Sequence, residues 1–312
     1  MKPHPLRPTS HVSALFACIF FASALTFAQT APGELTGHKL PPPGEPVQGT
    51  TSKMSEVEYD IVNGLETQKQ AEMLLQYAIS HHRGATDEIK RRVGQWVGKI
   101  RFTDSLNTLL EVALNGDDLR VRAASCEIEL AAFNVHKTEA EAEQLIHAVE
   151  SDPSKQTTAI TELGLLANRG IEPERIHNEL RAWMRSPDEQ VRFDTIRAIG
   201  FIGTDDTVAD LLDAFHHDSS ATVRIDGGGC GLAHCGMLTR AQRMQAVPGL
   251  IEMVEDKKLD EDTRPYGYRA LREITDQSLG DEPALWRDWY AAHGSQTTER
   301  FRRFQLESEA QP

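Results

Sequence analysis

Residues 186–200 read SPDEQVRFDTIRAIG, and this stretch decides the fold. Asp188 is a good N-cap residue, and Pro187 beside it ends the preceding helix. Gly200 suits the end of the helix that follows. Three apolar residues of the stretch fall on one helical face: Val191, Ile196 and Ile199. The stretch therefore predicts a short amphipathic helix that packs against other helices.

The same pattern recurs along the chain. Weaker copies lie at residues 118–124, 218–225 and 262–271, and a degenerate copy at 160–164 parallels 196–200. The valines of three copies are separated first by 70 residues, which is twice 35, and then by 32. Self-similarity at a period of about 20–50 residues is the signature of repeat architectures. Because no segment alternates at period two for long enough to be a strand, the sequence predicts an all-α fold.

The repeated motif, Asp-x-x-Val-Arg before an Ala-rich helix that ends in Gly, resembles the second helix of a HEAT repeat. The resemblance covers roughly residues 86–276 and implies a right-handed α-solenoid of stacked helix pairs. It also implies that the Asp caps its helix and that the Arg reaches towards a neighbouring repeat, building a polar ladder. We expect six pairs, at residues 56–101, 103–133, 138–169, 172–202, 204–236 and 239–276.

A final helix over residues 282–293 is expected to close the stack. The end of a repeat array must cover an apolar face that has no further neighbour. Trp286 and Trp289 stand at i and i+3 of this helix, as a cap requires, and an aromatic binding platform is the alternative use of the pair. Residues 270–290 also resemble the C-terminus of uncharacterised secreted bacterial HEAT-repeat proteins. That resemblance indicates a bacterial source and carries no activity.

Residues 1–28 read as a secretory signal peptide. A weakly basic start precedes an apolar run over residues 13–27, and small residues stand at −3 and −1 of a cut between Ala28 and Gln29. The run is shorter than the roughly 20 residues that span a bilayer. An uncleaved anchor is one alternative. Lipidation at Cys18 is another, although Phe16 is too bulky for a lipobox and the apolar run continues past Cys18. We expect a periplasmic or secreted protein with no membrane span after signal removal.

The rest of the chain divides by composition. Residues 29–54 hold five prolines and four glycines and are expected to form a disordered linker. The solenoid is expected over 55–294, and a polar, frayed tail over 295–312. The formal net charge is −14. Because affinity for nucleic acids comes from contacts between cations and phosphates, this charge argues against a nucleic-acid partner.

Three cysteines follow the signal peptide. Cys126 lies on an Ala-rich helix and is expected to be a buried thiol. Cys230 and Cys235 point in different directions on a straight helix, so a disulfide between them would need local unwinding. The run Gly227–Gly229 makes such unwinding conceivable, since each glycine costs a helix about 1 kcal/mol relative to Ala. The sequence leaves open whether these two cysteines are bridged and what the glycines do.

Cys230 and His234 stand at i and i+4, and with Cys235 they are weak candidates for metal ligands. A zinc site needs four ligands, and haem attachment needs Cys-x-x-Cys-His, which is absent. Deoxyhypusine hydroxylases, built from similar repeats, hold two irons with His-Glu pairs, and this chain has no His-Glu dipeptide. No lyase-specific motif of the phycobilin lyases, no Walker loop, no nucleophile elbow and no His-Glu-x-x-His is found. We expect no catalytic residue and no cofactor.

The resemblance implies a non-catalytic scaffold that binds a protein or peptide along its concave surface. Outward positions of the second helices are the candidates for contact with a partner: Arg120, Glu127, Asp194 and Arg197. Members of the polar ladder, or simply solvated residues, are the alternative interpretation. The alternative function is an enzyme or a metal or cofactor carrier of the lyase/hydroxylase-like class, centred on Cys230, His234 and Cys235.

Overall fold

The computed structural model describes residues 54–310, with side chains through residue 305. Helices joined by turns make up this part of the chain, and no strand forms in it. The expected signal peptide, the cut between Ala28 and Gln29, Cys18 and nearly all of the expected linker lie outside the described residues. Among the described helices, none combines the length and apolar character needed to cross a membrane.

Most helices follow one another in pairs, but two of the expected pairs are wrong in detail: residues 56–101 hold three helices, and residues 239–276 hold two additional short helices. The bounds of the helices are α1 (Glu56–Asn63), α2 (Thr67–Ile79), α3 (Ala85–Trp96), α4 (Asp104–Asn115), α5 (Leu119–Ala132), α6 (Glu139–Ser151), α7 (Gln156–Asn168), α8 (Pro173–Trp183), α9 (Glu189–Ile202), α10 (Thr207–His217), η1 (Val223–Gly229), η2 (Gly231–Cys235), α11 (Arg240–Arg243), η3 (Met244–Ala246), α12 (Val247–Glu255), α13 (Arg264–Thr275) and α14 (Pro283–Ala310). The prediction of an all-α stack is confirmed for residues 54–310.

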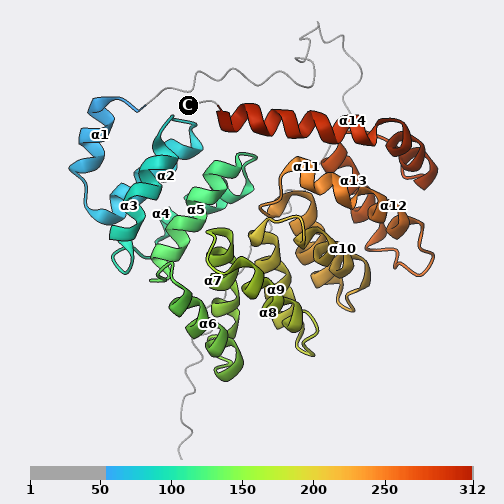
Figure 1. Ribbon diagram of the computed structural model, residues 1–312, viewed down its shortest axis with the longest axis horizontal. Helices are drawn as coiled ribbons and strands as arrows, with labels where there is room; N and C mark the ends of the chain where they lie inside the picture. Colours follow the sequence, from blue (N-terminus) through green and yellow to red (C-terminus); the bar gives the residue numbers. More distant parts are fainter. Residues whose placement is uncertain (1–53, 311–312) are drawn as a thin grey trace, which may run out of the picture. The chain divides into compact units, whose positions relative to one another are not determined.

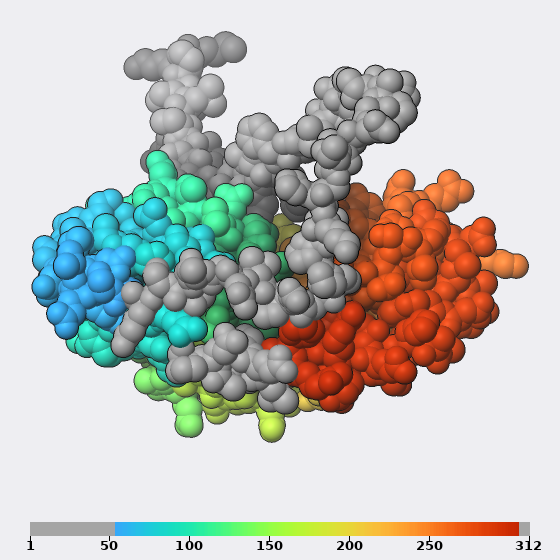
Figure 2. Space-filling model, turned by 90° about the horizontal axis from the view of Figure 1, so that it is seen from above, coloured from blue at the N-terminus to red at the C-terminus, as the bar shows by residue number. Residues whose placement is uncertain are grey.

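The pairs stack in two layers. The second helices α3, α5, α7, α9, η1 with η2, and α13 each pack on the next member of this series. The first helices, from α4 to α12, lie on the outer side of the curved stack, and α5, α7 and α9 lie on its inner side (Figure 1). Seen from above, the repeats run in chain order from α1, in blue, to the orange and red helices α12 to α14 (Figure 2).

The hydrophobic core follows the stack from end to end. One cluster of buried side chains runs from Met54 to Ala131, and the second runs from Cys126 to Phe301. Helix α5 contributes to both, with Ile128 in the first cluster and Leu130 in the second. Because each helix buries its apolar residues against both neighbours, no single repeat holds an independent core.

The helix ends follow the local sequence closely. The carboxylate of Asp188 accepts from the backbone N–H of Gln190, at 2.8 Å, and from that of Val191, at 3.4 Å, which confirms it as an N-cap. The expected end at Gly200 is wrong, because α9 continues to Ile202. Gly203 ends the helix with a φ of 73°, a left-handed conformation that favours glycine.

The terminal helix is longer than the sequence predicts. Helix α14 continues through Gly294 to Ala310, so the frayed tail expected from residue 295 is helical in the structure. Trp286 is fully buried, and its indole N–H donates to the carbonyl of Gly280 at 2.8 Å. Phe301 is also buried, and the Arg240 guanidinium lies 4.3 Å from its ring centre. These contacts extend the capping surface beyond the predicted end.

A π-helical segment replaces the regular second helix after α10. η1 and η2 are both π-helices, separated by Cys230. A Cβ on Gly228 would lie 2.6 Å from the carbonyl oxygen of Leu211 and from the backbone nitrogen of Phe215. The glycine run therefore lets η1 approach the backbone of α10 more closely than any side chain would permit.

Candidate functional site

Three arginines hold the turns that precede their own helices. Each follows the valine of its repeat and donates to the backbone carbonyl six residues upstream, at 2.6, 3.0 and 2.6 Å respectively: Arg122, Arg192 and Arg224. The carbonyls of a turn between helices need such partners when the turn is packed away from water. In these three repeats, the arginine of the Val-Arg motif thus stabilises its own turn, whether or not it also contacts another repeat.

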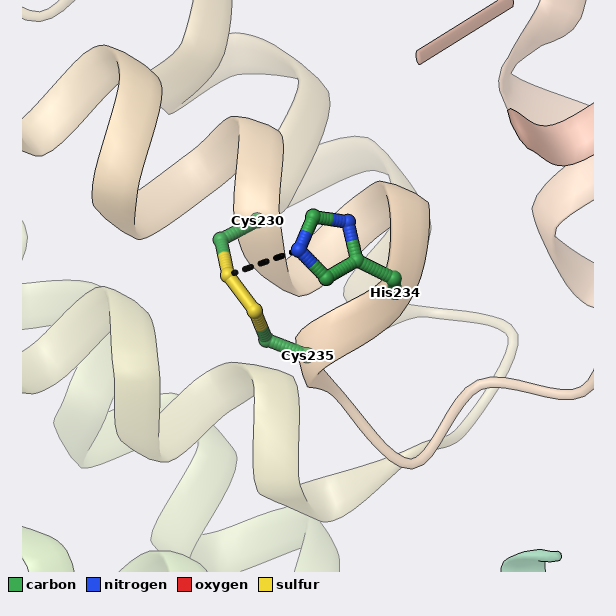
Figure 3. A group of neighbouring side chains, drawn as sticks. All are labelled: Cys230, His234 and Cys235. Atoms are coloured by element: carbon green, nitrogen blue, oxygen red, sulfur yellow. Dashed lines mark hydrogen bonds between the residues drawn. A yellow bond between two sulfur atoms is a disulfide. The ribbon is translucent and has the colours of Figure 1, made fainter. Parts of the chain in front are cut away.

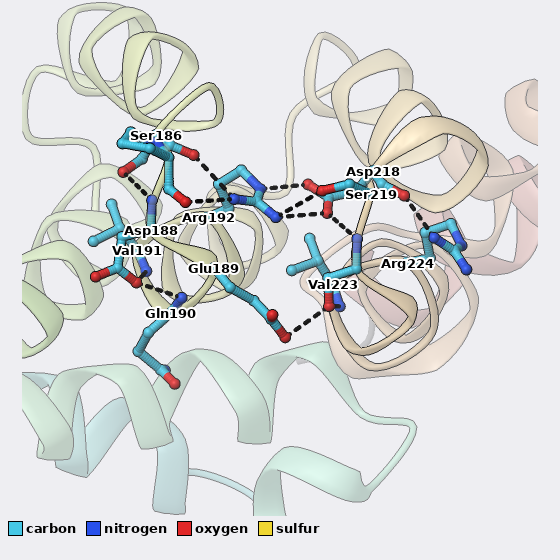
Figure 4. A network of polar contacts seen from close by, with 12 residues as sticks. Ser186, Asp188, Glu189, Gln190, Val191, Arg192, Asp218, Ser219, Val223 and Arg224 are labelled. Carbon is cyan, nitrogen blue, oxygen red and sulfur yellow. Dashed lines mark hydrogen bonds and ion pairs between the residues drawn. The ribbon is translucent and has the colours of Figure 1, made fainter.

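Two of these arginines also link successive repeats, and Figure 4 shows the link that Arg192 makes. Arg192 donates two hydrogen bonds to the carboxylate of Asp218, at 2.8 and 3.1 Å, and one to the hydroxyl of Ser219, at 3.1 Å. Arg224 makes the equivalent bond to Asp260 at 2.8 Å. The polar ladder that the resemblance implies is present at these two steps.

Arg122 departs from the ladder. Its guanidinium donates to the carbonyl of Gly236 at 2.6 Å, although the two residues are 114 positions apart. Arg243 donates to the carbonyls of Gly236, at 3.4 Å, and of Ala233. Burial lowers the pKa of Arg122 and lowers that of Arg243 to about 10, with the nearby charge of Arg122 adding to the effect. Two poorly solvated cations therefore meet at the end of η2.

Cys230 and Cys235 form a disulfide (Figure 3). A π-helix pairs residue i with residue i+5, whereas an α-helix directs those side chains apart. In the π-helical segment the two Cα atoms lie 5.1 Å apart, within the usual range for a bridge. The local unwinding that the sequence requires for this bridge thus takes the form of a wider helix.

His234 connects the disulfide to the next second helix. Its Nε2 lies 3.6 Å from Sγ of Cys230, and its Nδ1 lies 2.8 Å from Oε2 of Glu273 on α13. The other carboxylate oxygen of Glu273 accepts from Nε of Arg269 at 2.7 Å. The hydrogen bond from His234, followed by that from Arg269, lowers the pKa of Glu273 to about 2. An ionised carboxylate only accepts, so Nδ1 of His234 carries a proton and Nε2 is left facing the sulfur.

Cys230, His234 and Cys235 are also the residues that the sequence suggests as weak metal ligands. Their ligand atoms lie within 4.8 Å of one another. Metals bind the thiolate form of cysteine, and sulfurs joined in a disulfide have no thiolate to offer. In the bridged state of this structure, the donor set therefore does not suit a zinc ion.

The four predicted partner-facing residues separate into two classes. Glu127 and Asp194 are buried: Glu127 lies 2.7 Å from the Lys137 ammonium, and Asp194 accepts from Gln190 at 3.0 Å. Both carboxylates therefore act inside the stack.

Arg120 and Arg197 are exposed. Arg120 pairs with Asp118 at 3.2 Å, while Arg197 lies 5.7 Å from the ring centre of Phe193. A comparable combination of an aromatic residue and an arginine occurs on α13, where Tyr266 is 42% exposed and Arg269 is exposed as well. No sequence motif distinguishes Tyr266, Arg269 and Glu273, so the sequence does not predict them.

Comparison with known proteins identifies the repeat. A family model described as HEAT repeats matches residues 139–227, which span α6 to η1. No curated protein matches the chain. Within the matched range lie α9 and its Asp188 cap, Arg192 and the step of the ladder that Arg192 begins. Residues 139–227 therefore contain HEAT repeats, as the motif at residues 186–200 indicates.

Proposed function

We propose that this protein is an extracytoplasmic binding module that holds a protein partner on the layer of its second helices. HEAT repeats generally mediate interactions between proteins or act as scaffolds. The observation that carries the proposal is the contact of Arg197 with Phe193 on α9, together with the exposed Tyr266 and Arg269 on α13. We call Phe193, Arg197, Tyr266 and Arg269 the aromatic–arginine set.

The chemistry of this set suits a protein partner. Aromatic residues and arginine are enriched in protein interfaces, where rings bury large apolar area and guanidinium groups make directed hydrogen bonds. Arg197 and Tyr266 are exposed, and Phe193 is partly buried beneath its arginine. The net charge of −14 disfavours a phosphate backbone as the partner. Catalysis is not required for this role, and we propose none for the partner-binding surface.

The location outside the cytoplasm has two supports. Residues 1–28 have the regions of a secretory signal peptide. The Cys230–Cys235 disulfide suits an oxidising compartment, since thiols in the cytosol are kept reduced. Intact mass spectrometry of the natively expressed protein tests this half of the proposal. A chain beginning at Gln29 would support export, whereas an intact chain beginning at Met1 in the cytosol would contradict it.

Site-specific photo-crosslinking tests the binding surface. A photoreactive residue replaces Arg197 in the full-length chain expressed in its natural host, and a matched variant carries it at Arg185, an exposed residue after α8. We expect one reproducible protein adduct from position 197 that position 185 does not give. Arg269→Glu should weaken that adduct. Equal adducts from both positions, or none from 197, would contradict the assignment.

A further inference from the structure

The Cys230–Cys235 disulfide lies within one helical segment and joins no two repeats. A bridge that staples separate elements limits the freedom of the unfolded chain over a long loop. This one joins Cys230, which precedes η2, to the last residue of η2, five positions later, where the π-helix already sets the geometry. Its position therefore gives little support to the solenoid as a whole.

The surroundings of Cys230 favour its thiolate. Nε2 of His234 faces its sulfur at 3.6 Å, and Glu273 fixes the ring by accepting from Nδ1 at 2.8 Å. An adjacent imidazole lowers the pKa of a thiol, because it can take the proton and hold the resulting ion pair. The charged groups packed around this centre include further cations, Arg243 and Arg122, whose guanidinium groups meet the carbonyls of the η2 end.

The disulfide is accessible to reagents in solution. Both of its cysteines are partly exposed, and the His234 side chain is 44% exposed. Cys126 differs in each respect: it is fully buried, and burial raises the pKa of its thiol. Among the cysteines of the described chain, reactivity is therefore confined to one pair, and Cys126 provides an internal reference.

We infer that Cys230 and Cys235 form a redox-active pair that exchanges with external thiols and disulfides, with Cys230 as the sulfur activated by His234. In the oxidised form, a thiolate of a cysteine-containing peptide or protein attacks Sγ of Cys235. The S–S bond breaks, its electron pair leaves on Cys230, and His234 stabilises that thiolate. A second thiolate of the substrate then attacks the mixed disulfide and releases Cys235.

The exchange balances without any further reagent. Two substrate thiols lose two electrons and two protons and become a disulfide, while Cys230 and Cys235 gain them and become thiols. In the reverse direction His234 takes the proton of Cys230, whose thiolate attacks a substrate disulfide, and Cys235 resolves the mixed disulfide. This chemistry goes beyond partner binding and does not depend on it.

Redox equilibration of the full-length protein, with Cys18→Ser so that Cys126, Cys230 and Cys235 are its cysteines, provides the first test. The protein is equilibrated in glutathione buffers of graded ratio, free thiols are trapped with a maleimide, and intact mass counts the labels. We expect two labels to appear together at an intermediate ratio, with Cys126→Ala unchanged. A parallel series with a peptide that carries a cysteine pair distinguishes a protein thiol from a small one as the substrate. A bridge that stays closed in the most reducing buffers of both series would overturn the proposal.

Alkylation of the reduced protein tests the role of His234. The rate of reaction with iodoacetamide at pH 6 should fall about tenfold or more in His234→Ala, because the thiol pKa returns towards its ordinary value. Glu273→Gln should lower the same rate, and it replaces the glutamate by a side chain of nearly the same size. This second variant keeps the test valid if His234→Ala disturbs the fold. His136→Ala, at an exposed histidine, is the matched control and should leave the rate unchanged.

Two results would overturn this assignment. Equal alkylation rates in the wild type, His234→Ala and Glu273→Gln would show that His234 does not activate Cys230. Stoichiometric zinc retained by the reduced protein after dialysis would assign the site to metal binding instead.

Discussion

The Arg192 step of the ladder should be a main support of the stack, and Arg192→Ala tests this. Arg192 and Asp218 side chains are 12% and 9% exposed, and three hydrogen bonds join the guanidinium to Asp218 and Ser219. Truncating one partner of a buried pair costs about 3–5 kcal/mol. Because Asp218 keeps a hydrogen bond from the backbone of Ser220, we expect the lower value, about 3 kcal/mol.

Urea unfolding followed by far-UV circular dichroism measures this loss. A change of about 3 kcal/mol corresponds to a fall in Tm of roughly 6–12 °C for a domain of this size. The control is Arg175→Ala, whose guanidinium is 42% exposed and pairs with Glu143 and Glu172 at the surface. It should lose far less stability than Arg192→Ala, because solvent screens exposed ion pairs. If Arg192→Ala lies within about 0.5 kcal/mol of the wild type, or costs no more than the control, the ladder does not stabilise the stack as argued.

Two further predictions concern stability. Burial raises the pKa of Glu162 to about 7 from an ordinary value of 4.5, so the folded state binds more protons than the unfolded state between these values. The free energy of unfolding should therefore fall as pH rises from about 4.5 to 7. Glu162→Gln should flatten this trend and stabilise the protein at pH 8 by roughly 1–3 kcal/mol. Urea titrations at pH 5 and 8 that show no difference between the two proteins would contradict this. Gly228→Ala would place a Cβ against backbone atoms of Leu211 and Phe215 and should cost about 1–3 kcal/mol or more. Gly94 has open space around it, so Gly94→Ala should stabilise α3 by roughly 0.5–1 kcal/mol. Equal effects of the two substitutions on Tm would contradict the close approach of η1 to α10.

Glu273 and Tyr266 show why parts of the candidate site could not be predicted. Glu273 reaches His234 across 39 residues, and only the packing of α13 against η2 brings them together. Tyr266 precedes that contact on the same helix with no motif around it. Glu127 shows the opposite case. Its position in the helix predicted an outward side chain, but Lys137 and Arg169 pair with it between repeats. Periodicity identifies the face of a helix, but it does not say what the neighbouring repeat places against that face.

The sequence by itself determined the repeat, the pairing of helices and the N-caps, because these depend on residues close together in the chain. Asp188 caps α9 through atoms two and three residues away, and such contacts form in any context that allows a helix. The tertiary structure alone decided the π-helical form of η1 and η2, since that form depends on how closely Gly228 approaches α10. It also decided that Arg122 meets Gly236, because the curvature of the stack, summed over several repeats, brings together residues that no local pattern relates.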